Sequence, residues 1–337
     1  MHSIIKRPWS AKPKIPTVSV IMSVYNGETF LNAAIESILN QTYTDFEFII
    51  IDDESSDRSV KIIKSYDDDR IRFVPQHNKG LVASLNRAIK LSRGTFIARM
   101  DQDDISMPTR IEKELAWISK DSRRGLVSTY FSLINYADSK LLDINLTFPP
   151  THTDLRRALY ITNPFPHGAC MFRKEAVEGL GGYRNDYGPT EDYELWTRLA
   201  EHWEVGLVPE ILFWYRINNP ESMSQKSNDE QNVYVSRIRN EQWRRPFVAK
   251  SAWRIRKDMQ TLKQQVGPDY VVQVISEYKS EQFALSKELL LRGKLRNAAI
   301  QLLGTMLIVP VTSLHLFRYM PHALKLGIKV QARRLMR

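Results

Sequence analysis

The alternation of short apolar stretches with amphipathic stretches over residues 17–104 constrains the fold more than any other feature. Four apolar, β-branched runs predict strands, at 17–24, 46–53, 71–76 and 95–101. Three stretches between them repeat apolar residues at helical spacing, at 26–41, 55–66 and 80–94. Because only a few residues connect each strand to the next helix, the pattern predicts a parallel, doubly wound sheet.

The second half of the chain has a mixed pattern. It predicts strands at 126–136, 204–209 and 211–217, a short strand and a Gly-rich turn within 168–183, and helices at 108–120, 151–163 and 190–203. From about residue 228 the pattern is helical and polar. No internal repeat or low-complexity segment interrupts the chain.

Polar side chains follow three of the predicted strands at their carboxyl ends, where open parallel sheets bind ligands. They are Ser23, Tyr25 and Asn26, then Asp52 and Asp53, then Asp101, Asp103 and Asp104. The G-x-G-x-x-G fingerprint is absent after the first strand, which argues against a Rossmann dehydrogenase. The P-loop pattern is absent as well.

Three aspartates within residues 101–104 repel one another unless a cation or several donors offset their charge. Mg²⁺ and Mn²⁺ prefer such oxygen ligands and keep positions for phosphate. The ion would stabilise the charge that builds on a leaving nucleoside diphosphate. A solvated acidic turn explains the same tripeptide, and the spacing alone does not separate the two interpretations.

Four stretches, taken together and in this order, carry a family resemblance: "VSVIMSVYNGETFLNAAIESILNQTYTDFEFIIIDDESSD", "NKGLVASLNRAIKLSRGTFIARMDQDD", "HGACMFRKEAVEGLGGYRN" and "TEDYELWTRLA". Through them the chain resembles the family-2 glycosyltransferases of bacterial polysaccharide and glycolipid synthesis, which are inverting enzymes with the GT-A nucleotide-diphospho-sugar transferase fold. The resemblance implies an α/β fold with a Rossmann-like mixed sheet flanked by helices. It also implies the domains: an extension at 1–16, a catalytic domain at 17–225 (nucleotide part 17–104, acceptor part 105–225) and a helical basic region at 226–337.

The resemblance also implies donor-binding residues. Tyr25 would flank the base and Asp53 would accept a hydrogen bond from its edge, which fits the N3–H of uracil and a UDP-sugar. Asp101 and Asp103 would hold Mn²⁺ or Mg²⁺, with Asp103 the more direct ligand, while Asp104 would cap the next helix. The full set expected at the nucleotide is Ser23, Tyr25, Asn26, Glu28, Asp53, Asn78, Gly80, Asp101 and Gln102.

Asp192, in "TED", matches the family's general base. An inverting transfer needs a carboxylate on the acceptor side that takes the hydroxyl proton during attack. Glu191 would orient the acceptor beside it. Without the resemblance, both acids would be ordinary charges at a helix N-terminus.

Several positions depart from the family pattern. Ser23 stands where proline is common, Glu54 where glycine is usual, and Asn218 where relatives often carry histidine. His167 is then the imidazole best placed to assist at the metal or phosphate, and the alternative is an ordinary loop histidine held by a hydrogen bond. Trp196 is expected in the core. Because the Q-x-x-R-W signature and several transmembrane helices are missing, we expect addition of a single sugar rather than processive synthesis.

The C-terminal tail concentrates the positive charge. The net charge is +10, and residues after Glu288 carry nine basic and no acidic side chains, so residues 1–288 carry 10 − 9 = +1. Residues 297–317 lack charged side chains but contain polar ones, which favours an interfacial segment on an anionic membrane over a spanning helix. A packed helical hairpin is the alternative, and no motif supports nucleic-acid binding.

The N-terminus lacks the apolar core of a signal peptide, and the single cysteine, Cys170, excludes an intramolecular disulfide. We therefore expect a cytoplasmic protein, peripheral on the inner face of the membrane, with a saccharide or lipid-linked saccharide as acceptor. The alternatives are a nucleotidyltransferase, which would need a Gly-rich basic first loop, and an inactive saccharide- or nucleotide-sugar-binding protein. The sequence does not identify the donor sugar.

Overall fold

The computed structural model describes residues 15–135, 140–142, 150–159, 162–217 and 228–244. The chain divides into two compact units. The first comprises residues 1–146, 165–186 and 194–222, and the second comprises 147–164, 187–193 and 223–337. Asn218, residues 297–317 and the basic tail lie outside the described residues.

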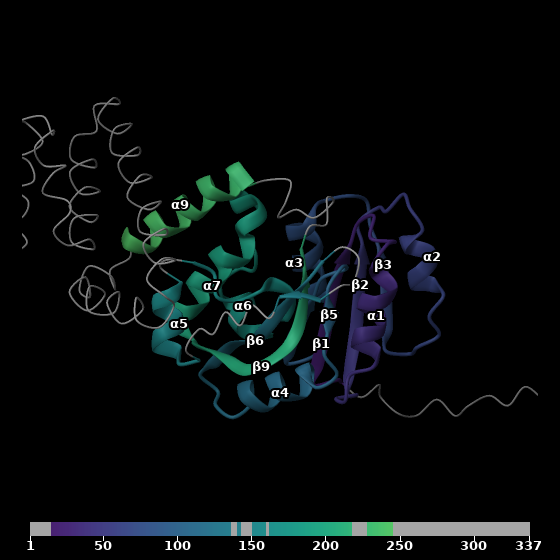
Figure 1. Ribbon diagram of the computed structural model, residues 1–337, viewed down its shortest axis with the longest axis horizontal. Helices are drawn as coiled ribbons and strands as arrows, with labels where there is room; N and C mark the ends of the chain where they lie inside the picture. Colours follow the sequence, from purple (N-terminus) through teal and green to yellow (C-terminus); the bar gives the residue numbers. More distant parts are fainter. Residues whose placement is uncertain (1–14, 136–139, 143–149, 160–161, 218–227, 245–337) are drawn as a thin grey trace, which may run out of the picture. The chain divides into compact units, whose positions relative to one another are not determined.

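Four parallel strands form one half of the sheet, in the order β3-β2-β1-β4 (Figure 1). They are β1 (Val18–Val24), β2 (Phe46–Asp52), β3 (Ile71–Pro75) and β4 (Phe96–Met100). Helices α1 (Leu31–Leu39), α2 (Ser59–Lys64) and α3 (Leu81–Leu91) connect them in turn. The predicted β-α alternation over residues 17–104 is confirmed.

Beyond β4 the sheet becomes mixed, so the parallel arrangement predicted from residues 17–104 ends there. The strands are β5 (Ile105–Ser106), β6 (Arg124–Ile134), β7 (Lys140–Leu142), β8 (Met171–Arg173) and β9 (Glu204–Arg216). Strand β8 pairs antiparallel with both β4 and β6, while β9 runs parallel to β6. This is the mixed sheet that the family resemblance implied.

Strand β9 is one long strand where the sequence predicted two. Its pairing with β6 shifts register so that Val208 lies opposite Thr129 and Ile211 opposite Tyr130, which leaves Pro209 and Glu210 outside the register. Proline has no amide hydrogen for the ladder, so a bulge accommodates it. The strand therefore continues past the proline and ends at Arg216.

The remaining helices follow or precede the strands of the second half. They are α4 (Arg110–Ile118), α5 (His152–Ala158), the short η1 (His167–Ala169), α6 (Lys174–Gly179), η2 (Asn185–Thr190), α7 (Glu191–His202) and α9 (Asn228–Arg244). Residues 191–193 of α7 belong to the second unit and residues 194–202 to the first.

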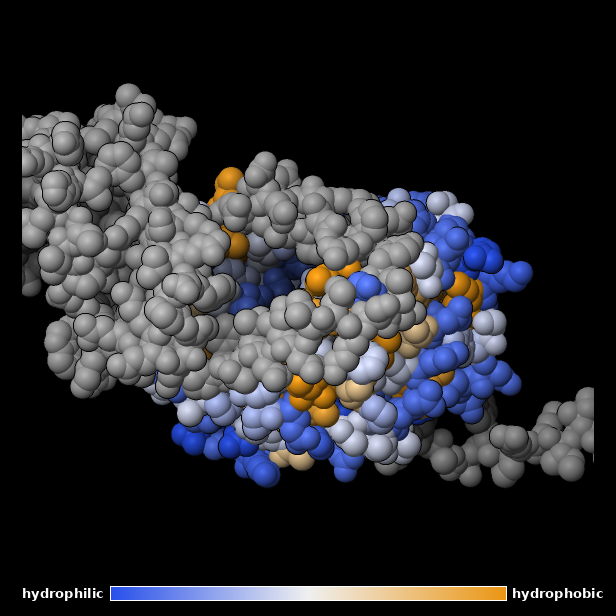
Figure 2. All heavy atoms as spheres, in the orientation of Figure 1, coloured by the Kyte–Doolittle hydropathy of each residue, from blue (hydrophilic) through white to orange (hydrophobic). Residues whose placement is uncertain are grey.

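The core of the first unit lies on the face of the sheet that α1 and α4 cover. Val20, Met22 and Phe48 pack there against Ile35 and other apolar residues. All seven residues of β2 are buried, as expected for a strand covered on both faces. The visible coloured surface is mostly hydrophilic with separated hydrophobic patches (Figure 2). None of the helices within the described residues has the length and apolarity needed to cross a bilayer.

Candidate active site

The loop after β1 and the loop after β2 are joined by hydrogen bonds. We call residues 25–28 the first loop and residues 53–59 the second loop. The amides of Asn26, Gly27 and Glu28 donate in turn to Ser55 Oγ (3.0 Å), Ser59 Oγ (2.9 Å) and Asp57 Oδ2 (2.9 Å). Residues 26–28 therefore lie in a loop whose amides are held by side chains, and α1 begins at Leu31.

The side chains of Asn26 and Glu28 return these contacts. Asn26 Oδ1 accepts from the amide of Ser56 at 2.8 Å, and Glu28 Oε2 accepts from the amide of Arg58 at 2.8 Å. Both residues were expected at the nucleotide. The structure gives them a second task, since they hold the first and second loops together.

Asp53 organises a third loop, residues 76–80, which precedes α3. Its buried carboxylate accepts from Gln76 Nε2 (2.7 Å) and the Lys79 amide (2.9 Å) on Oδ1, and from the Gly80 amide (2.8 Å) on Oδ2. Gly80 has φ of 83°, a conformation that favours glycine. The predicted residues Asp53 and Gly80 are therefore in direct contact.

Glu54 extends this arrangement by one residue. Its Oε2 accepts from the amide of Asn78 at 3.0 Å, and its Oε1 lies 3.0 Å from His77 Nδ1. These hydrogen bonds, the one from Asn78 first, lower the pKa of Glu54. The amides of residues 78–80 thus all point at protein carboxylates, so they are not arranged to hold a diphosphate.

The backbone at Glu54 has φ of 67°, in the left-handed region. Glycine adopts this region without a steric penalty, so the glycine that the family resemblance implies at this turn would fit this conformation. The contacts to Asn78 and His77 offset part of the strain in this chain.

Tyr25 is one of the few large hydrophobic side chains that are exposed among the described residues, at 52%. Its main chain is held by Gln102, whose Oε1 accepts from the Tyr25 amide (2.9 Å) and whose Nε2 donates to the Tyr25 carbonyl (3.2 Å). Gln102 therefore joins the first loop to residues 101–104, which we call the acid loop. Ser23, at the end of β1, is half-buried.

A cation from β4 pairs with the acid loop. Asp101 Oδ1 forms an ion pair with Arg99, the next-to-last residue of β4, whose side chain is buried. Gly168 packs closely against the same carboxylate, because a Cβ at Gly168 would lie 2.7 Å from Asp101 Oδ2 and 3.2 Å from Asp104 Oδ2. Two of the three aspartates therefore meet at a position where only glycine fits.

Asp104 does not cap α4, contrary to expectation. Thr109 occupies the position before that helix, and Asp104 Oδ1 instead accepts from the amide of Arg216 at 2.7 Å. Burial, followed by the negative charges of Asp103 and Asp101, raises the pKa of Asp104 well above its usual range. Its Oδ2 is buried and accepts no hydrogen bond from the described residues.

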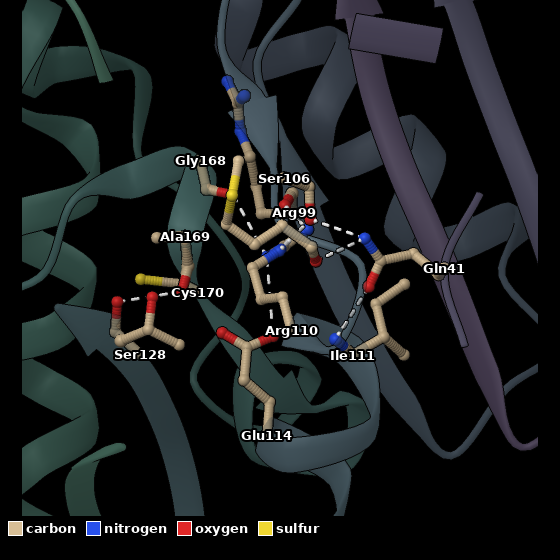
Figure 3. Close-up of polar contacts among 12 residues, drawn as sticks. Gln41, Arg99, Ser106, Arg110, Ile111, Glu114, Ser128, Gly168, Ala169 and Cys170 are labelled. Carbon is tan, nitrogen blue, oxygen red and sulfur yellow. Dashed lines mark hydrogen bonds and ion pairs between the residues drawn. The ribbon is translucent and has the colours of Figure 1, made fainter. Parts of the chain in front are cut away.

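A buried arginine beneath the acid loop was not predicted. Arg110 donates to Ser106 Oγ (2.7 Å), to the Arg99 carbonyl (3.2 Å) and to the Gly168 carbonyl (3.3 Å), and it pairs with Glu114 at 3.4 Å (Figure 3). It therefore connects α4 to the main chain of β4 and of η1. Burial raises the pKa of Glu114 to about 8, although the positive charge of Arg110 opposes this.

His167 lies beside Gly168 and contacts Tyr183, with its Nε2 2.9 Å from the tyrosine hydroxyl oxygen. Burial, and then the charge of Arg99, lower the pKa of His167 well below its usual range, so the imidazole is neutral at pH 7. The ring also packs edge-on against Trp196, which is fully buried. The expectation that Trp196 belongs to the core is confirmed.

The second unit contains Glu191 and Asp192 at the start of α7. Asp192 Oδ2 accepts from Asn163 Nδ2 at 2.8 Å, and its Oδ1 accepts from the amide of Tyr193 at 2.6 Å. Glu191 is buried. Asn163 orients the carboxylate of Asp192 and was missed by the sequence analysis, since one asparagine in "ITNPFP" carries no distinguishing signal. The base role of Asp192 stays a prediction.

The carboxylates of the acid loop suit a hard divalent cation whose coordination is completed by the phosphates of the substrate. No cluster of three or more His, Cys, Asp or Glu side chains in the described ranges could hold a metal ion by itself. Mg²⁺ is commonly bound through one or two carboxylates together with substrate phosphates. Asp101 and Asp103 offer two carboxylates that are only half-buried, so the donor set of the acid loop fits such an ion.

A mixed α/β sheet, with loops at the carboxyl ends of its parallel strands and an acid loop after the fourth of them, is the architecture that the family resemblance implied. The profile of glycosyl transferase family 2 matches residues 19–181. The chain is 33% identical over 218 residues to the O-antigen biosynthesis glycosyltransferase WbnJ of Escherichia coli, which covers 62% of this chain and 82% of WbnJ. It is 30% identical over 236 residues to a glycosyltransferase of Haemophilus influenzae, which covers 67% of this chain and 73% of that protein.

The solved structure of S. aureus TarS, residues 1–349 with UDP, has the same fold. It aligns over 95% of this chain and 90% of TarS with a TM-score of 0.56 and 15% sequence identity. The chain belongs to glycosyl transferase family 2, and it is a glycosyltransferase.

Proposed function

We propose that the protein transfers one sugar from a nucleotide sugar, with inversion, to a saccharide or lipid-linked saccharide during assembly of a cell-surface polysaccharide or glycolipid. The observation that carries this proposal is the pair of hydrogen bonds between the Gln102 side chain and the Tyr25 main chain. They hold the acid loop beside the first loop, which is expected to hold the base. The relationship to WbnJ, named for O-antigen biosynthesis, supports the polysaccharide setting.

The donor is a UDP-sugar in this proposal. TarS has been solved with UDP and with UDP-GlcNAc, which supports a uridine donor for a protein of the same fold. Tyr25 offers its exposed ring to the base. Asp53 acts on the base edge directly or through the third loop, which its carboxylate organises.

Asp103 is the direct ligand of Mn²⁺ or Mg²⁺ in this account. Asp101 pairs with Arg99 and so contributes to the shape and charge balance of the acid loop. When bound, the cation would stabilise the charge on the departing diphosphate. The chain itself orients the carboxylates, through Gln102 and the hydrogen bonds that hold the acid loop.

Asp192 is the general base, and Asn163 holds its carboxylate. The carboxylate removes the proton from the acceptor hydroxyl as that oxygen attacks C1 of the sugar opposite the diphosphate. Glu191 orients the acceptor beside it. Both roles are proposals that rest on the match of "TED" to the family pattern.

The acceptor is placed at an anionic membrane surface by the C-terminal tail. Nine basic residues and no acid follow Glu288, and each basic group near an anionic surface contributes about 1 kcal/mol of attraction. We propose that residues 289–337 bind the cytoplasmic face peripherally. Flotation of the full chain with anionic and with neutral vesicles tests this, and recovery of the protein at the bottom of both gradients at low salt would refute it.

A donor screen tests the transferase proposal. The purified chain is incubated with UDP- and GDP-sugars and Mn²⁺ or Mg²⁺, and release of nucleoside diphosphate is measured. We expect release from one UDP-sugar, dependent on the metal and abolished in Asp103→Ala. If the wild type releases no nucleoside diphosphate from any donor with either metal, the proposal is contradicted and an inactive binding protein is favoured.

A further inference from the structure

Arg216, the last residue of β9, is anchored to the acid loop by both its main chain and its side chain. It is 3% exposed. Its Nε donates to the carbonyl of Asp103 at 2.7 Å, and its amide donates to Asp104 Oδ1 at 2.7 Å. One residue therefore fixes two consecutive members of the acid loop.

The guanidinium of Arg216 is held from two further sides. One terminal nitrogen donates to the carbonyl of Asn135, just past the end of β6, at 2.8 Å. The guanidinium carbon also lies 3.9 Å from the ring centre of Phe30, a residue between the first loop and α1. A planar, stacked cation with hydrogen bonds in its plane has little freedom to turn.

These contacts constrain the main chain at Asp103, from which its side chain departs. The carbonyl of Asp103 and the carboxylate of Asp104 are both fixed, so the main chain at Asp103 has few orientations available. We propose that Arg216 is a positioning residue, which aims the Asp103 carboxylate at the metal-diphosphate of the donor. This inference rests on the proposed metal role of Asp103.

The proposal predicts that lysine cannot replace Arg216. A lysine ammonium keeps the charge, but it is a compact charge on a flexible stem and lacks the planar fork that reaches two carbonyls while stacking on a ring. Removing residues that orient a metal ligand lowers metal affinity by about 10- to 100-fold. We expect a loss of that size in Arg216→Lys.

Arg173 offers a matched control at the other end of the sheet. It is 9% exposed, donates to the carbonyls of Arg124 (3.2 Å) and Asp121 (3.4 Å), and lies 5.0 Å from the ring centre of Phe96. Phe96 begins β4 and the acid loop follows its end. Arg173→Lys therefore removes a similar set of contacts without touching the acid loop.

The experiment measures Mn²⁺-dependent binding of UDP by titration calorimetry in the wild type, Arg216→Lys and Arg173→Lys, together with urea unfolding. We expect affinity to fall about 10- to 100-fold in Arg216→Lys, and to change less than about twofold in Arg173→Lys although that variant also loses stability. Hydrogen exchange of the ligand-free proteins adds a second readout, in which amides of residues 101–106 should exchange faster only in Arg216→Lys.

Each outcome decides the proposal. If Arg216→Lys binds UDP with Mn²⁺ as tightly as the wild type and its amides at residues 101–106 exchange at the wild-type rate, the positioning role alone is overturned. If the wild type shows no Mn²⁺-dependent binding of UDP, the proposed function is overturned and this inference with it. If Arg216→Lys does not fold, Phe30→Leu removes only the stacked ring, and an affinity loss of about threefold to tenfold is then expected. Unchanged affinity in Phe30→Leu would then count against the proposal.

Discussion

The carboxylate of Asp101 is paired with the guanidinium of Arg99, which lies buried at the end of β4. This pairing explains how three aspartates within four residues are tolerated. One negative charge is offset by an internal cation, and burial disfavours a second, because it raises the pKa of Asp104 well above its usual range. The metal role that we propose for Asp103 rests on the match of residues 101–103 to the family's D-x-D motif.

The two aspartates of the D-x-D motif should therefore differ in their effect on stability. Asp101→Asn leaves Arg99 buried without its carboxylate and should lower the free energy of unfolding by on the order of 3 kcal/mol. Asp103→Asn should change it by about 1 kcal/mol or less, since that residue is only half-buried. Urea unfolding of both variants measures the difference. Equal losses would show that the Arg99–Asp101 pair is not a structural contact.

Gly168 should not tolerate a side chain. A Cβ there would lie 2.6 Å from Phe213 Cζ and 2.7 Å from Asp101 Oδ2, so Gly168→Ala should cost about 1–3 kcal/mol of stability through overpacking. Gly179→Ala is the matched control, because a Cβ at Gly179 meets no atom within 4 Å. Thermal unfolding should show a lower Tm for the first variant only. A Tm equal to that of the wild type in Gly168→Ala would contradict the close contact.

Glu114 should make stability depend on pH. Its pKa is raised from 4.5 to about 8 by burial, so between these values the folded chain keeps a proton that the unfolded chain releases. Stability from this group is complete below about pH 4.5 and is lost as the pH rises through 8. The difference should be on the order of a few kcal/mol, since one pKa unit is worth about 1.4 kcal/mol.

Glu114→Gln should flatten that dependence, because glutamine does not titrate. The exposed Glu112 lies on the same helix, so Glu112→Gln should keep the wild-type slope. Urea unfolding at several pH values between 5 and 9 compares the three proteins. A wild-type slope in Glu114→Gln would show that another group is responsible.

Asp192→Asn should separate binding from turnover. Loss of a general base lowers turnover by on the order of 10²–10⁴, while donor affinity should stay within a few-fold. Asp154→Asn makes the same chemical change within the second unit, at the start of α5, and should leave turnover within about twofold. Near-normal turnover of Asp192→Asn at saturating acceptor would remove Asp192 from the mechanism.

The sequence predicted the elements that local periodicity specifies. Strands β1 to β4 and the helices between them lie where the apolar spacing placed them, because strands buried on both faces and amphipathic helices have strong patterns. The order and direction of β5 to β9 did not follow from that spacing. Strand direction depends on pairing between distant segments such as β4 and β8, which no local pattern records.

Buried polar contacts were the other part that the sequence did not reveal. Arg99 and Arg110 look like surface residues by type, yet both are buried beneath the acid loop and paired with acids. Asp104 resembled a helix cap because it precedes "ISMP", but β5 lies between it and α4. The metal-binding roles of Asp101 and Asp103 and the base role of Asp192 stay predictions.

The most direct test of this account is calorimetric titration of UDP into the wild type and Asp103→Asn, each with Mn²⁺ and with the metal removed by chelation. The account predicts that the wild type binds UDP at least about tenfold more tightly with Mn²⁺, as expected when a carboxylate and the diphosphate share the ion. Asp103→Asn should bind UDP equally with and without the metal while unfolding like the wild type. Equal metal dependence in both proteins would contradict the assignment of the acid loop as the donor's metal site.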